Sequence, residues 1–174
     1  MQMTINFGLI IAYFLPGVLV TYSLRYLSFR IDHLLKVVEE GQAFIGPAAI
    51  LIMGALVAGL IISSVRVVLV EPLIHFTGVP KPRTDYKKLA PAEQWAVYSQ
   101  IVENIYRFYQ FYGNIFLGLL MLGLIRYLIA GVPIFSSVQS ASLFALTTGS
   151  VVTLFFAARQ SMKQLCSALD DLCK

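Results

Sequence analysis

Four long apolar runs divide this chain, and they constrain its fold more than any other feature. They cover residues 5–28, 43–66, 111–133 and 137–158. About 20 mainly apolar residues are needed to span the hydrocarbon core of a bilayer, and each run meets that length. Lipid cannot satisfy backbone polar groups, so a spanning segment must be a helix or part of a closed barrel. We therefore expect an all-α integral membrane bundle of four transmembrane helices, in a single domain over residues 1–174.

The composition excludes a water-soluble globule. Hydrophobic residues make up 58% of the chain and charged residues only 13%, whereas a soluble domain carries about 25% charged residues. The formal net charge is +4, and we assign it to contact with lipid headgroups. Nucleic acid is not an expected partner, because the densest basic region is only the scattered set Lys81, Arg83, Lys87 and Lys88.

The first two runs contain small or helix-bending residues. Pro16 lies in the middle of the first run and predicts a kink, which serves either packing or a hinge. In the second run Ala55, Gly59 and Ser63 recur every four residues. This small-residue stripe lets another helix approach closely, either within the chain or between chains. We expect Arg66, at the end of this run, to extend toward the headgroups.

The segments between the runs are polar and punctuated by proline. Residues 29–42 predict an amphipathic segment at the membrane surface. Residues 71–110 predict an extended loop followed by an amphipathic interfacial helix that leads into the third run. Aromatic residues gather there, and tyrosine and tryptophan concentrate at headgroup level. The expected interface anchors are Trp95, Tyr106, Tyr109 and Tyr112. Residues 159–174 predict an amphipathic C-terminal tail, which lies on the membrane or pairs with a neighbouring subunit.

The fourth run has an unusual polar side. Its members share small size or a hydrogen-bonding side chain, and they follow helical spacing: Gln139, Ser142, Gly149, Ser150 and Thr153. In a membrane helix such a side favours contact with protein or water over lipid. Two interpretations stay open, namely interior packing with hydrogen bonds between helices, and a water-lined pathway in an oligomer.

The distribution of basic residues predicts the orientation. Four spans place both termini and the 71–110 segment on one side, where nine Lys and Arg residues lie against four on the other. Basic residues are enriched on the cytoplasmic side. We therefore expect cytoplasmic N- and C-termini in a cell inner membrane, although the first run has no Lys or Arg before it and three soon after.

The sequence carries no recognisable catalytic constellation. GxSxG, HExxH, Walker and dinucleotide-binding motifs do not occur. The two cysteines, Cys166 and Cys173, form no CxxC pair and have no histidine nearby, so we expect no metal and no cofactor. No carboxylate falls inside the four runs, which argues against an ion-coupled transporter. We expect a protein that is not an enzyme.

Two patches carry a resemblance to a known group of proteins. Phe14-Leu15-Pro16-Gly17 in the first run, and the segment RFYQFYGN from Arg107 to Asn114 entering the third, resemble small uncharacterised bacterial multi-pass membrane proteins. Some of those proteins are encoded with anti-phage defence systems, as sensors or membrane-disrupting effectors. The resemblance implies a bacterial, non-enzymatic membrane component and supplies no site residues.

These observations lead to one functional hypothesis and two alternatives. The hypothesis is a homo-oligomeric membrane component, a sensor or membrane-perturbing effector that alters the bilayer or recruits a cytosolic protein to residues 71–110. The first alternative is a channel or transporter subunit whose path is lined by the polar side of the fourth run. The second alternative is a membrane-embedded enzyme that acts on lipid.

Overall fold

The computed structural model describes residues 7–41, 45–81, 92–129, 131 and 137–172, and all of the elements in these residues are helical. The prediction of an all-α fold is confirmed. In chain order the helices are α1 (Phe7–Leu24), α2 (Phe29–Glu39), α3 (Ile45–Phe76), α4 (Ala92–Ile101), η1 (Val102–Tyr106), α5 (Arg107–Gly123), η2 (Leu124–Ile129) and α6 (Val138–Leu172). The elements η1 and η2 are π-helical turns, so α4, η1, α5 and η2 follow one another as one long helix.

Three of the helices are long and apolar enough to cross a membrane, which indicates a membrane protein. They are Ile45–Phe76, Gln94–Ile129 and Val138–Leu172. Helix α1 is also apolar but shorter. Because these lengths exceed the roughly 20 residues that a straight span needs, the three helices have room to tilt or to extend beyond the hydrocarbon core.

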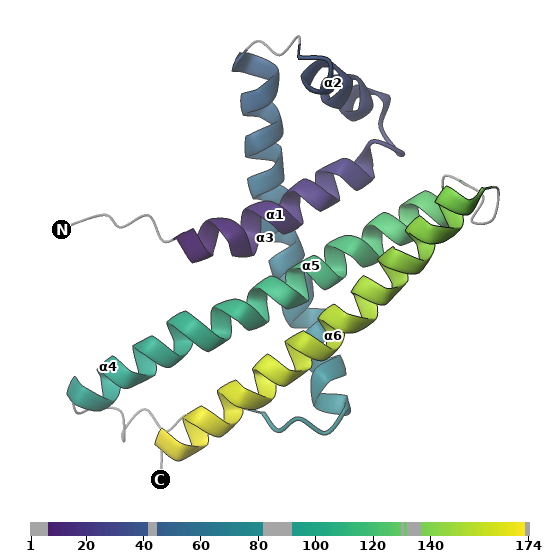
Figure 1. Ribbon diagram of the computed structural model, residues 1–174. Helices are drawn as coiled ribbons and strands as arrows, with labels where there is room; N and C mark the ends of the chain where they lie inside the picture. The colour runs from purple at the N-terminus through teal and green to yellow at the C-terminus, as the bar shows by residue number, and fades with distance from the viewer. Residues whose placement is uncertain (1–6, 42–44, 82–91, 130, 132–136, 173–174) are drawn as a thin grey trace.

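The helices form an open arrangement (Figure 1). Helices α5 and α6 run side by side in opposite directions, α1 crosses α3 and lies along α5, and α2 lies beside the first part of α3. The main core lies where the end of α3, the start of α5 and the last half of α6 meet. Its most buried members include Val70, Ile74, Tyr109, Leu117, Ala158, Met162, Cys166 and Leu169.

Two helices are longer than the sequence predicted. Helix α3 continues to Phe76 with Pro72 inside it, whereas we expected the span to end at residue 66 and a polar stretch to begin at residue 71. The apolar residues 67–70 extend the helix, and one proline costs only one backbone hydrogen bond. The expectation that no carboxylate lies within the spans therefore needs correction, because Glu71 is inside α3.

Helix α6 also continues through the expected tail and ends at Leu172. Its buried residues all lie in this last half, and Met162, Leu165 and Leu169 belong to the core of the same chain. The heptad-like spacing of the tail thus packs on α4, η1 and α5 of the same chain, where its apolar side is buried.

Candidate functional site

The crossing of α1 over α3 is built on glycine. A Cβ atom added at Gly17 of α1 would overlap the carbonyl oxygen of Ala55, and one added at Gly59 of α3 would overlap the carbonyl oxygen of Tyr13. The predicted small-residue stripe of Ala55, Gly59 and Ser63 is buried along its length. The stripe therefore faces α1 of the same chain, where backbone approaches backbone as small residues permit in membrane helices.

The kink residue Pro16 creates a gap in the backbone hydrogen bonds of α1. Proline has no N–H, so the carbonyl oxygen of Ala12, four residues earlier, loses its helical donor. The side-chain Nδ2 of Asn114 on α5 donates to this oxygen at 2.9 Å. Asn114 is fully buried. In lipid an unsatisfied carbonyl is costly, so α5 supplies the hydrogen bond that α1 cannot make for itself.

A second amide follows one helical turn earlier on α5. Gln110 is 9% exposed, and its Nε2 donates to the hydroxyl oxygen of Tyr13 at 3.3 Å. Gln110 and Asn114 thus lie on the same side of α5, as residues four apart do in a helix. Together they join α5 to two consecutive residues of α1, Ala12 and Tyr13.

A buried cation of α3 contacts the same part of α5. Arg66 of α3 is only 1% exposed, and its Nη1 is 3.1 Å from Oε1 of Glu71. The guanidinium carbon lies 4.6 Å from the ring centroid of Tyr109, which favours a cation–π interaction. Gly113 makes room for the side chain, because a Cβ there would be 2.7 Å from Cδ of Arg66. Arg66 is therefore enclosed by protein, and it does not extend to the headgroups as the sequence suggested.

Only one partner of the ion pair between Arg66 and Glu71 is partly exposed. The side chain of Glu71 is 25% exposed and lines an open cavity of about 650 Å³ together with His75 and Lys81. Among the described residues, Nε of Arg66 and the hydroxyl of Tyr109 have no hydrogen-bond partner. The pair keeps Arg66 neutralised inside the bundle, while its carboxylate faces the surroundings of the protein.

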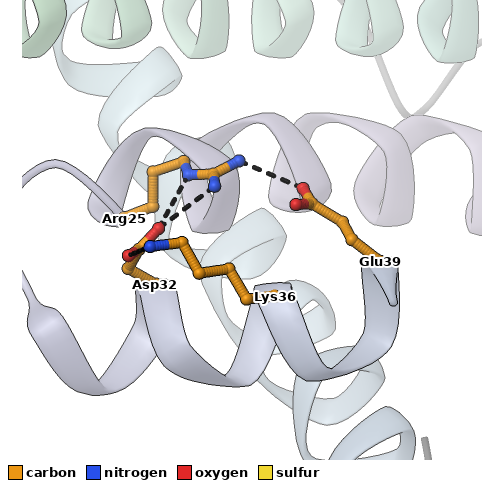
Figure 2. Close-up of polar contacts among 4 residues, drawn as sticks. All are labelled: Arg25, Asp32, Lys36 and Glu39. Carbon is orange, nitrogen blue, oxygen red and sulfur yellow. Dashed lines mark hydrogen bonds and ion pairs between the residues drawn. The ribbon is translucent and has the colours of Figure 1, made fainter. Parts of the chain in front are cut away.

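A second charge cluster joins α2 to the end of α1 (Figure 2). The guanidinium of Arg25 lies 3.1 Å from Asp32 and 3.1 Å from Glu39, and Nζ of Lys36 lies 2.7 Å from Asp32. The hydrogen bond from Lys36, and after it the one from Arg25, holds the pKa of the Asp32 carboxyl below its usual 3.8 against the opposing effect of desolvation. The cluster fixes the direction in which α2 leaves α1.

The polar side of α6 points away from the rest of the chain. Every predicted member is exposed: Gln139, Ser142, Gly149, Ser150 and Thr153. Two of the hydroxyls bond to their own helix, since Ser142 donates to the Gln139 carbonyl and Thr153 to the Gly149 carbonyl, each at 2.9 Å. In the described chain, this side of α6 therefore does not pack against the other helices.

The predicted aromatic anchors divide into two groups. Trp95 is 54% exposed and its ring lies 5.3 Å from that of Tyr98. Tyr106 and Tyr112 are partly buried. Tyr109, in contrast, is fully buried against Arg66, whereas sequence analysis expected it at the membrane surface.

Sequence reasoning missed Glu71, Gln110 and Asn114 as partners in this site. The available signal was a pair of amides four residues apart at the start of an otherwise apolar run. Both amides belong to the segment from Arg107 to Asn114, and Pro16 and Gly17 belong to the other quoted patch. Asn114 of one patch donates to the Ala12 carbonyl, whose helical donor is missing because of Pro16 in the other patch.

Within the described residues, no group of three or more His, Cys, Asp or Glu side chains could hold a metal ion. No family model, no curated protein and no solved structure matches this chain. The geometry of the site and the exposed face of α6 are therefore the basis for a functional proposal.

Proposed function

We propose that this protein is a non-enzymatic membrane component that works as a homo-oligomer, with the polar side of α6 as the contact between copies. The observation that carries the proposal is how little of the apolar part of α6 is buried within one chain. Only 6% of its most apolar stretch is buried against the rest of the chain, compared with 33% for the helix Gln94–Ile129. Small and hydroxyl-bearing residues in this position favour close packing between membrane helices.

The proposal includes a membrane arrangement. Helix α1 has 18 residues, which at 1.5 Å per residue gives about 27 Å and nearly matches the hydrocarbon core. We propose that α1 is the fourth span, that both termini are cytoplasmic and that the membrane is a bacterial inner membrane. The basic residues near the end of α3, such as Lys81, then lie on the cytoplasmic side.

In this arrangement, assembly through α6 alters the bilayer or recruits a cytosolic protein to the 71–110 segment, as a sensor or membrane-perturbing effector does. The resemblance of the two sequence patches to proteins encoded with anti-phage systems supports this role. The exposed ring of Trp95 on α4, which lies against the partly buried Tyr98, is a suitable contact for a partner at the membrane surface.

Native mass spectrometry of the full chain in nanodiscs tests the proposal. We expect a defined oligomer for the wild type and dissociation to monomers for Gly149→Leu, because a side chain there projects into the proposed contact. The matched control is Gly54→Leu on α3, since a Cβ at either glycine meets no atom within 4 Å in one chain. A monomeric wild type, or identical oligomers for both variants, contradicts the proposal.

The same exposed hydroxyls support a second candidate function, a channel formed between copies of α6. Ser150 and Thr153 would then line a water-filled path. Ion flux into liposomes that Ser150→Leu and Thr153→Leu abolish would favour the channel. Absence of flux from a wild-type oligomer would leave the contact between copies as the role of this side.

A further inference from the structure

An apolar groove runs between the end of the α5–η2 helix and the first half of α6. Its volume is about 390 Å³. Hydrocarbon side chains make up most of its wall, and they include Leu119, Leu120, Leu124, Leu128, Phe144 and Val151. Both helices that form the groove are among those long and apolar enough to cross a membrane. The groove is therefore open to the acyl chains of the bilayer along its length.

One end of the groove is polar. Tyr127 lines it, and the guanidinium carbon of the adjacent Arg126 lies 5.7 Å from the Tyr127 ring centroid. Among the described residues, the hydroxyl of Tyr127 and Nε of Arg126 are buried and have no hydrogen-bond partner. Buried donors of this kind are normally satisfied, and the described residues supply no acceptor at this end of the groove.

Within the part of the chain that the structure describes, the charge of Arg126 also has no counterion. The described residues contain no carboxylate within ion-pair distance of it. The sequence itself has no Asp or Glu between Glu103 and Asp170, so neither helix of the hairpin can supply one nearby. An unpaired cation within a membrane helix marks a functional position. The chemistry that completes it is an anion with several acceptor oxygens, and a phosphate is such an anion.

The local backbone is irregular at the same place. Arg126 and Tyr127 belong to the π-helical turn η2, and π-helical turns occur frequently at functional sites. The turn ends at Ile129 near the connection to α6, which places Arg126 toward the end of the span. From Tyr127 to Leu119 the groove extends about 12 Å toward the middle of the helix at 1.5 Å per residue.

We propose that this groove binds an anionic phospholipid. One acyl chain lies in the groove, and the phosphate accepts hydrogen bonds from the guanidinium of Arg126 and the hydroxyl of Tyr127. A free phosphate would satisfy the donors but leave the hydrocarbon wall uncovered. A zwitterionic lipid offers a phosphate whose charge its own ammonium group already balances, so the charge of Arg126 would stay uncompensated. The inference concerns a different side of α6 from the proposed contact between copies and does not depend on it.

The test measures lipid that stays bound to the full chain in native mass spectrometry after extraction from vesicles of equal parts phosphatidylglycerol and phosphatidylcholine. We expect preferential retention of phosphatidylglycerol by the wild type. Arg126→Gln should lower that retention about tenfold, because charge-assisted hydrogen bonds to the phosphate are lost. The matched control Arg30→Gln removes one exposed arginine of α2 and should leave retention unchanged.

A second variant tests the acyl part and does not alter charge. Gly123 lines the groove, and a Cβ there meets no atom within 4 Å, so Gly123→Leu fills the groove and should fold. It should displace the lipid, whereas Gly54→Leu on α3 should not. If Arg126→Gln fails to fold, Gly123→Leu carries the test alone.

Three results would overturn the proposal. The first is equal retention of both lipids by the wild type. The second is retention that Arg126→Gln lowers and Gly123→Leu does not, together with binding of inorganic phosphate, which would identify a free anion as the ligand. The third is unchanged lipid with an altered oligomer in Gly123→Leu, which would show that a second copy fills the groove.

Discussion

The guanidinium of Arg66 is paired with the carboxylate of Glu71 five residues further along α3, yet the two partners differ in exposure, at 1% and 25%. Removing Glu71 should therefore change the stability of the protein by a different amount from removing Arg66. Without Glu71, a charge remains enclosed by Tyr109 and Gly113; without Arg66, the remaining carboxylate borders an open cavity. Breaking a buried pair is strongly destabilising, whereas replacing both partners by apolar residues is often tolerated.

We expect Glu71→Leu to lower the free energy of unfolding by about 3 kcal/mol, Arg66→Met to lower it less, and the double variant to recover most of the loss. Thermal unfolding of the four proteins in one mild detergent measures these differences. Equal losses for the two single variants would contradict the effect of their different exposure. Additive losses in the double variant would show that the pair does not act as a unit.

The hydrogen bond from Asn114 to the Ala12 carbonyl is expected to be worth about 1–2 kcal/mol. Asn114→Leu keeps the volume and removes the donor, so it should destabilise the protein by that amount. In a Pro16→Ala background, residue 16 regains an N–H for the Ala12 oxygen, and the same Asn114→Leu change should cost much less. A double-mutant cycle measures the coupling, and a coupling energy of zero would contradict the assignment.

The glycines at the α1–α3 crossing should not tolerate a methyl group. Gly59→Ala would place a Cβ on the Tyr13 carbonyl, which forces the helices apart at a cost of about 1–3 kcal/mol. Gly54→Ala, on the same helix with no atom within 4 Å of the added Cβ, should be neutral or stabilising because alanine favours a helix. Unfolding temperatures of the two variants compare the positions directly, and equal shifts would argue against the close crossing.

The charge cluster at Asp32 predicts a dependence of stability on pH. Because its folded-state pKa lies below 3.8, ionised Asp32 stabilises the fold above that pH, and the stabilisation disappears as pH falls through the lower folded-state value. Wild type should exceed Asp32→Asn in unfolding temperature at about pH 6 and match it near pH 2. Asp170→Asn, which alters an exposed carboxylate at the other end of the fold, should show no such convergence.

The features that sequence alone could predict depend on composition and periodicity over many residues. The all-α fold and the small-residue stripe of Ala55, Gly59 and Ser63 are of this kind, since apolar length and four-residue spacing determine them. The end of α3 was misplaced because Arg66 and Glu71 look like boundary charges when each is considered alone. Their mutual neutralisation depends on folding, and it keeps both inside one helix.

The polar site could not be predicted in the same way because its contacts join distant segments. Tyr109 is indistinguishable by sequence from the neighbouring tyrosines, and only the crossing of α3 and α5 places it on Arg66 rather than at the membrane surface. Likewise, Asn114 lies in an apolar run with no local partner. Its acceptor is the backbone carbonyl of residue 12. Every residue type has such a carbonyl, so the identity of residue 12 does not indicate the bond.

The hydrogen bond between α5 and α1 also imposes an order on biosynthesis. The donor Asn114 is synthesised 102 residues after its acceptor, which at about 5–20 residues per second corresponds to roughly 5–20 s of translation. Throughout that interval the Ala12 carbonyl of the nascent α1 is without this donor. For α1 as the proposed fourth span, entry into hydrocarbon would therefore carry a penalty until α5 leaves the ribosome and reaches it.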